Sequence, residues 1–163
     1  MINKNPKLIK YKNFKDSRGL LVPFEIKNKM IKINNSFYFK MKRIFFSAGK
    51  KNYYRGDHAH KKCSQILLCL NGSIVVETIK ENKVRKFKIN KNKNEVLFIP
   101  PMVWNRLYFK NNNSILAVIC DYKYDHKNEY IDDYNEFIRL SSNWWILKVL
   151  AILMTLKKII HLF

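Results

Sequence analysis

Short hydrophobic runs separated by polar turn residues fill the chain from about Leu8 to Asp121. The runs include LIKYKNF, LLVPFEI, SFYFKMKRIFFS, QILLCL, SIVVETI, VLFIPPMVW and SILAVIC. No helical period connects them, and the Asn71-Gly72 pair between two β-rich runs is typical of a hairpin turn. Many short strands at regular spacing predict an all-β fold, a barrel or a sandwich.

The pattern changes past Asp121. The apolar and aromatic residues of YDHKNEYIDDYNEFIRL recur every three to four positions, which predicts a short helix packed against the barrel. These residues are Tyr130, Ile131, Tyr134, Phe137 and Ile138. We therefore divide the chain into a β domain over residues 1–140 and an apolar, basic helical tail over residues 141–163.

The tail ends in WWILKVLAILMTLKKIIHLF. Its longest uncharged run, from Val149 to Leu156, is far shorter than the roughly 20 residues of a transmembrane helix. Paired tryptophans at one end and Lys157-Lys158 near the other are typical of peripheral contact with anionic lipid. A helix packed on the barrel, and a span in which Lys148 snorkels, stay open as alternatives.

The formal charge of +20, from 32 Lys and Arg against 12 Asp and Glu, favours an anionic partner. The excess is mostly lysine scattered among Asn and Ile, as in KINKNKNE, which is typical of a polar surface rather than a dedicated patch. No aromatic and basic stacking motif for RNA is present, so we expect no nucleic acid partner.

Three cysteines, Cys63, Cys69 and Cys120, have no CxxC spacing, and two of them lie in apolar runs. Buried, reduced thiols are the expected state, and they suit a cytoplasmic location. The N-terminal MINKNPKLIKYKNF is too polar for a secretion signal.

Candidate chemistry centres on RGDHAHKKCSQILLCLNG, residues 55–72. Strand residues two apart share a face, so His58 and His60 are expected to point the same way. An HxH pair on the inner wall of a small barrel resembles the first motif of the cupin superfamily, G-x5-H-x-H-x3-4-E-x6-G. Gln65 stands at the position of the acidic ligand, and Gly72 at the final glycine.

The second cupin motif, P-x-G-x2-H, corresponds to PPMVWN, in which Asn105 replaces the third histidine. Two imidazoles and two amides are weaker metal ligands than three imidazoles and a carboxylate. We therefore expect no metal and no cofactor. The matches at Gln65, Gly72 and Asn105 also argue against an HxH pair that is merely exposed on a strand.

Imidazoles titrate near neutral pH, so two of them in a barrel mouth can move protons in both directions. Such chemistry suits a carbon beside a carbonyl group. A base takes the proton from the neighbouring carbon, an enediol forms, and the proton returns to the former carbonyl carbon. The ketone has then moved by one carbon.

RGDHAHKKCSQILLCLNGSIVV resembles the signature of the dTDP-sugar 3,4-ketoisomerases, cupin enzymes that act on dTDP-4-keto-6-deoxyglucose. KDSRGLLVPFE, IPPMVWNRLYF and AVICDYKYDHKNEYIDDYNEF resemble the family's opening segment, closing strands and tail helix. The resemblance covers about Leu8 to Leu140. It implies a small cupin-type β-barrel (jelly roll) with a short C-terminal helical extension, and a homodimer. It also implies a dTDP-3-keto-6-deoxyhexose product, which the family normally supplies for 3-amino sugars of surface glycans such as lipopolysaccharide O-antigen.

The resemblance also implies residue roles. His58 would carry the proton from C3 to C4, and His60 would move protons between the two oxygens or orient its partner. Arg18 would reach the hexose, unless it is a surface residue beside a turn. Arg55 is a candidate for the pyrophosphate, because a guanidinium matches phosphate oxygens. Gln65 would bind the nucleotide or serve as a core amide.

Two departures from the family pattern matter. Asn105 stands where some members have His or Arg near the sugar, so the C4 configuration of the product stays open, with Arg18 favouring galacto over gluco. Phe45 and Phe46 replace a tyrosine-containing strand. If a tyrosine normally shares the proton transfer, Tyr53, Tyr54 or water would have to replace it.

Three other classes of protein are alternatives. A dTDP-sugar 3,5-epimerase would use a histidine base and an opposing tyrosine acid, but IFFS lacks the tyrosine and HAH holds two close histidines. A non-catalytic sugar-nucleotide-binding cupin would keep ligand affinity without a reaction. A basic nucleic-acid-binding barrel would show strongly salt-dependent binding.

Overall fold

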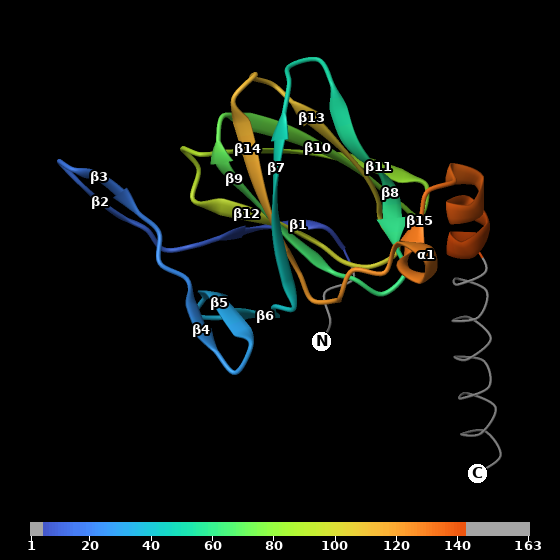
Figure 1. Cartoon of the computed structure of the whole chain (residues 1–163), viewed down its shortest axis with the longest axis horizontal. Coiled ribbons are helices and arrows are strands. Elements are labelled where there is room, and N and C mark those ends of the chain that lie inside the picture. The colour runs from blue at the N-terminus through green and yellow to red at the C-terminus, as the bar shows by residue number, and fades with distance from the viewer. Residues whose placement is uncertain (1–4, 143–163) are drawn as a thin grey trace, which may run out of the picture.

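The computed structural model describes residues 5–142, in which two five-stranded antiparallel sheets form a barrel (Figure 1). The first sheet contains, in spatial order, β1 (Lys7–Lys10), β12 (Glu95–Ile99), β9 (Gln65–Asn71), β14 (Ser114–Cys120) and β7 (Arg43–Gly49). The second contains β11 (Lys83–Asn90), β10 (Ser73–Lys80), β13 (Trp104–Phe109), β8 (Tyr54–His60) and β15 (Tyr130–Ile131). The predicted all-β barrel with a short helical extension is confirmed.

Alternation of side chains along the strands builds the core between the two sheets. In SIVVETIK of β10, Ile74, Val76 and Thr78 are buried, whereas the residues between them are partly exposed. The largest cluster of buried apolar side chains takes its members from both sheets, including Leu67 and Leu116 from the first. The three cysteines are free and buried, as predicted.

A second apolar cluster lies on the outer side of the first sheet. Three short strands cover this side and form their own sheet: β4 (Glu25–Lys27), β5 (Met30–Asn34) and β6 (Phe37–Lys40). Ile31 and Phe39 pack there with Ile66, Phe98 and other residues of the barrel. This small sheet leaves part of the outer face of β9, β14 and β7 uncovered, as the exposure of Phe46 (64%) and Leu70 (44%) shows.

The hairpin of β2 (Phe14–Asp16) and β3 (Gly19–Leu21) projects away from the barrel, on the opposite side of the molecule from β15 (Figure 1). All residues of both strands are exposed, although several are large and apolar. The side chain of Leu21 is 64% exposed. A hairpin of this kind buries almost nothing on its own chain.

The Asn71-Gly72 turn does not join a pair of hydrogen-bonded strands, so the predicted hairpin is wrong. β9 belongs to the first sheet and β10 to the second, and the turn carries the chain from one to the other. Gly72 has a φ of +76°, and a Cβ there would lie 2.3 Å from Ser114 Oγ. The local signal identified a tight turn correctly but not the partners of its strands.

The predicted helix after Asp121 is split in two. Helix α1 (His126–Glu129) is followed by β15, whose Tyr130 and Ile131 pair with β8, and a second helix starts at position 134 and continues to position 142. Two aspartates explain the split. Asp125 accepts a hydrogen bond from the backbone of α1, and Asp133 accepts one at the start of the second helix.

Residues 143–163 lie outside the described residues, so the predictions for the helical tail and its membrane contact are not tested. Within residues 5–142, no helix is long and apolar enough to span a membrane. The proposed domain boundary at residue 140 stays a prediction.

Candidate active site

A β-bulge in β8 sets the directions of the site residues. His58 lies opposite Asn105 of β13, and the register shifts at the next position, so that Asp57 is an extra residue. Gly56 and Asp57 have φ values of +82° and +62°. A Cβ at Gly56 would lie 2.9 Å from the backbone oxygen of Asn105, which explains the glycine. Because of the bulge, Arg55 faces the same side as His58.

The side chains of Arg106 and Trp104 bind the carboxylate of Asp57 at the bulge. The Asp57 carboxylate accepts hydrogen bonds from Arg106 Nε at 2.8 Å and from Arg106 Nη2 at 2.6 Å. Trp104 Nε1 donates to the same oxygen at 3.0 Å. Three donors on one carboxylate stabilise the bulge and, through it, the position of His58.

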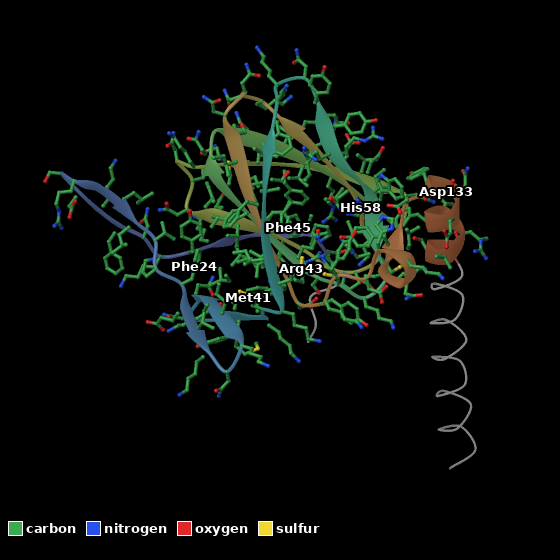
Figure 2. All side chains as sticks on the ribbon, in the orientation of Figure 1. Phe24, Met41, Arg43, Phe45, His58 and Asp133 are labelled. Atoms are coloured by element: carbon green, nitrogen blue, oxygen red, sulfur yellow. The ribbon has the colours of Figure 1, made fainter. Side chains whose placement is uncertain are left out.

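A cavity of about 210 Å³ opens between the sheets beside His58. Its polar lining residues are Ser47, Arg55, His58, Gln65, Asn105 and Tyr130. Phe45 and several aliphatic side chains form the rest of the wall, and Figure 2 labels Phe45 and His58. A second, more open pocket of about 610 Å³ shares Arg55 and is lined also by Lys50, Tyr53 and Tyr54.

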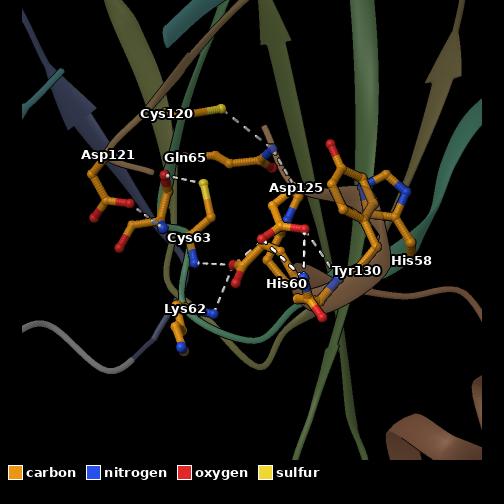
Figure 3. Close-up of polar contacts among 12 residues, drawn as sticks. His58, His60, Lys62, Cys63, Gln65, Cys120, Asp121, Asp125 and Tyr130 are labelled. Atoms are coloured by element: carbon orange, nitrogen blue, oxygen red, sulfur yellow. Dashed lines mark hydrogen bonds and ion pairs between the residues drawn. The ribbon is translucent and has the colours of Figure 1, made fainter. Parts of the chain in front are cut away.

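His58 is the imidazole that lines the cavity. The centre of its ring lies 5.0 Å from that of His60 and 4.9 Å from that of Tyr130 (Figure 3). Its backbone oxygen accepts a hydrogen bond from Asn105 Nδ2 at 3.1 Å. Burial lowers the pKa of His58, so the ring is neutral near pH 7 and can accept a proton.

His60 lies deeper, with 4% of its surface exposed, and is not among the residues that line the cavity. Its Nε2 is 3.1 Å from Gln65 Nε2. Because an amide nitrogen can only donate, His60 Nε2 accepts and the neutral ring carries its hydrogen on Nδ1. Burial, with His58 and Arg43 nearby, lowers the pKa of His60 to about 3. His60 is therefore neutral near pH 7 in the folded protein.

Glu129 is buried next to His60, and the sequence did not predict it as a site residue. Its side chain is 2% exposed, and Oε1 lies 4.0 Å from His60 Nδ1. The same oxygen accepts hydrogen bonds from the backbone N–H groups of Lys62, at 2.7 Å, and Cys63. These bonds hold the carboxylate 4.0 Å from His60 Nδ1, a buried atom that has no hydrogen-bond partner among residues 5–142.

Tyr130 and Arg43 complete the cluster, and neither was predicted as a site residue. The Tyr130 ring lies 4.4 Å from that of His60. Arg43 Nη2 is 3.4 Å from the Tyr130 hydroxyl and 3.5 Å from Cys120 Sγ. The guanidinium also stacks over Phe45, with 5.1 Å between its carbon and the ring centre. No motif in the sequence connects Arg43 with Tyr130, because the pairing of β15 with β8, far from β7 in the sequence, brings them together.

The structure brings four of the predicted site residues to the cavity, namely Arg55, His58, Gln65 and Asn105. Arg18 is elsewhere, because its side chain is 88% exposed on the projecting hairpin and binds Asp16 at 2.6 Å. The tyrosines expected to replace the missing one, Tyr53 and Tyr54, line the neighbouring pocket instead. The roles given to all of these residues stay predictions.

Within residues 5–142, no three His, Cys, Asp or Glu side chains gather in a metal-binding arrangement. Gln65 binds His60 and lies 3.9 Å from Cys120 Sγ, so its amide nitrogen has protein partners. The expectation that the protein uses no metal and no cofactor stays a prediction.

A two-sheet barrel with a neutral His-x-His pair beside a polar cavity defines a cupin-type enzyme. The family model described as "FdtA: WxcM-like, C-terminal" matches residues 4–142. The chain belongs to this family.

Several characterised proteins are similar to this chain. The TDP-4-oxo-6-deoxy-alpha-D-glucose-3,4-oxoisomerase of Aneurinibacillus thermoaerophilus is 33% identical over 132 residues, which cover 80% of this chain and 88% of that protein. QdtA, a sugar 3,4-ketoisomerase from Thermoanaerobacterium thermosaccharolyticum solved with TDP, is 30% identical with a TM-score of 0.74, over 88% of this chain and 98% of that one. WlaRA, a TDP-fucose-3,4-ketoisomerase from Campylobacter jejuni, is 31% identical with a TM-score of 0.71, over 85% and 97%. The predicted family and the predicted enzyme class, a sugar 3,4-ketoisomerase, are confirmed.

Proposed function

We propose that this protein converts dTDP-4-keto-6-deoxyglucose into a dTDP-3-keto-6-deoxyhexose. The observation that carries the proposal is the neutral imidazole of His58, which lines the cavity and packs against His60 and Tyr130. The similar protein from Aneurinibacillus thermoaerophilus is named for its action on TDP-4-oxo-6-deoxy-alpha-D-glucose, which supports this choice of substrate.

The two pockets match the two halves of such a substrate. The smaller one holds the polar groups around His58 and suits the keto sugar. The larger one carries Lys50 and two tyrosines, which suit a nucleotide and its phosphates. Arg55 lies on both, where a guanidinium can bind diphosphate oxygens bidentately.

His58 acts as the base. It removes the C3 proton, the electron pair forms the C3–C4 double bond of an enediol, and the proton returns to C4 as the ketone forms at C3. His60 keeps His58 in place, since its own Nε2 is bonded to Gln65 and its ring packs edge to face with that of His58. His60 is thus a positioning residue.

A 3,5-epimerase is less well supported by this geometry. Such an enzyme needs a proton donor across the sugar from the base. Here the Tyr130 ring packs against both imidazoles, at 4.9 Å from His58 and 4.4 Å from His60, on the same side of the cavity. A non-catalytic sugar-binding cupin is left to the experiment below.

We also propose that the protein is a homodimer. The hairpin that carries Arg18 exposes Phe14, Leu20 and Leu21, and part of the outer face of the first sheet exposes Phe46. A second copy would cover these apolar surfaces. The same contact would let Arg18 reach the active site of the other copy. Its predicted role at the hexose, and the galacto product that it favours, would then be carried out across the dimer.

The ketone at C3 of the product is the group that a transaminase converts to an amine. A place before such a transaminase, in making 3-amino sugars for surface glycans, fits this chemistry. A cytoplasmic location and peripheral membrane contact through the tail also stay predictions.

The test is a proton NMR time course of the purified protein with dTDP-4-keto-6-deoxyglucose in ordinary water. We expect the signals of a 3-keto sugar to replace those of the substrate, and the C4 coupling constants then give the configuration. His58→Asn should abolish the reaction while TDP still binds, and Val84→Asn, at an exposed position on β11, is the control. An untouched substrate with bound TDP would instead support the non-catalytic cupin.

A further inference from the structure

The reaction moves two protons, and His58 accounts for one of them. While a proton goes from C3 to C4, the C3 hydroxyl must lose its proton and the C4 oxygen must gain one. His60 is poorly placed for the second transfer, because Gln65 occupies its Nε2 and the residue is not among those that line the cavity. The group that serves the two oxygens therefore has to be found among the other residues that line the cavity.

Tyr130 is the lining residue whose hydroxyl is best suited to this transfer. It comes from β15, pairs with β8 at His60, and packs against both imidazole rings (Figure 3). Its oxygen accepts a hydrogen bond from Arg43 Nη2, so its own O–H remains able to donate into the cavity. Burial raises the pKa of Tyr130, so the phenol is protonated near neutral pH.

The other polar lining residues fit the transfer less well. Arg55 does not give up a proton in proteins. Asn105 uses its amide nitrogen on the backbone of His58, and Gln65 uses its own on His60. Ser47 also offers a hydroxyl, but within residues 5–142 no Lys or Arg donates a hydrogen bond to it. Ser47 therefore serves as the control below.

We propose that Tyr130 is a catalytic residue that carries the proton between the two sugar oxygens, with Arg43 stabilising its ionised form. This inference rests on the proposed ketoisomerase function. As His58 takes the C3 proton, the C3–C4 double bond forms and the carbonyl electrons move to the C4 oxygen, which gives an enediolate. In a second step the C4 oxygen takes the Tyr130 proton, and the tyrosinate takes the proton of the C3 hydroxyl. The C3 carbonyl forms as the double-bond electrons take the His58 proton at C4. No outside oxidant or reductant is needed.

This role of Tyr130 explains how the protein can catalyse the reaction although β7 carries Phe45 and Phe46 in place of a tyrosine. Phe45 lines the cavity without a hydroxyl, and Phe46 points to the outside with 64% of its surface exposed. The phenol comes instead from the segment after α1. Arg43, on β7, supports it with its guanidinium.

The experiment measures two rates in deuterated buffer on one sample. The first is exchange of the C3 proton of the substrate with solvent, which needs His58. The second is formation of the 3-keto product, which needs the oxygen transfer as well. The variants are Tyr130→Phe, Ser47→Ala and His60→Gln, and thermal unfolding with TDP binding confirms that each one folds.

We expect Tyr130→Phe to slow product formation by about 100-fold or more, the usual contribution of an acid–base group, while C3 exchange continues. The ratio of exchange to product then rises sharply. Ser47→Ala should keep the wild-type ratio. His60→Gln should slow both rates together, because it disturbs His58.

A purely structural Tyr130 would give the opposite result, with exchange and product falling equally. Exchange that continues in His60→Gln while product is lost would assign the transfer to His60 and overturn the proposal. If the wild-type protein shows neither exchange nor product, the ketoisomerase function itself has failed, which this design separates from failure of the Tyr130 role.

Discussion

Acid should destabilise this protein through His60 in a way that can be calculated from its surroundings. The ring is 4% exposed, accepts a hydrogen bond from Gln65, and has its pKa lowered from 6.5 to about 3. In the unfolded chain the same imidazole titrates normally. Between pH 6.5 and about 3 the unfolded state therefore binds more protons than the folded state, so the free energy of unfolding falls as the pH falls.

The magnitude follows from the two pKa values. Above pH 6.5 both states are neutral and His60 has no effect. At pH 5.0 the unfolded imidazole is about 30 times more protonated than neutral, while the folded one stays almost entirely neutral, and RT times the logarithm of this ratio is about 2 kcal/mol. His58, whose pKa is also lowered by burial, adds a loss of the same sign.

Urea unfolding of the wild-type protein and of His60→Gln, at pH 7.5 and pH 5.0, measures this contribution. The wild-type protein should lose about 2 kcal/mol more than the variant between the two pH values. Equal losses in the wild-type protein and His60→Gln would show that His60 titrates normally when folded, and would refute the description of its hydrogen bond and burial.

Three further predictions concern the bulge, the dimer and the nucleotide. Asp57→Ala should lower the free energy of unfolding, measured in urea, by about 1–3 kcal/mol, because it removes charge-assisted hydrogen bonds that are partly screened by solvent. Asp57→Asn should lower it less, because one acceptor oxygen remains. Equal losses in the two variants would contradict the contacts of Asp57 with Arg106 and Trp104. Leu21→Glu should convert the dimer to monomer in light scattering, whereas Val84→Glu, at an exposed position on β11, should not, and a monomeric wild-type protein would remove the dimer proposal. Arg55→Ala should weaken TDP binding about tenfold or more by calorimetry, and unchanged affinity would place the diphosphate elsewhere.

The strands and the orientation of the histidine pair could be predicted because both depend on local periodicity. Alternation in SIVVETIK identifies an inner and an outer face, and the spacing of His58 and His60 puts their rings on one side, 5.0 Å apart. The Asn71-Gly72 signal was equally local and gave the turn, but not which sheet each strand joins. Strand partners depend on contacts far apart in the sequence.

The rest of the site depends on such distant contacts. Glu129 reaches the backbone after His60 from 66 residues away, and Arg43 reaches Tyr130 from 87. A period of three to four placed Tyr130 in a helix, whereas two capping aspartates leave room for a short strand beside β8. The side of the barrel that Arg55 faces follows from the bulge at Asp57, which no periodic pattern reveals.

The most direct test of the account follows the wild-type reaction with dTDP-4-keto-6-deoxyglucose in deuterated water and locates the deuterium in the product by NMR. We expect a ketone at C3 and an unchanged proton at C5. The hydrogen at C4 comes from His58, either as the transferred C3 proton or as deuterium where the imidazole has exchanged with solvent. A ketone that remains at C4, with deuterium at both C3 and C5, would contradict it and identify an epimerase.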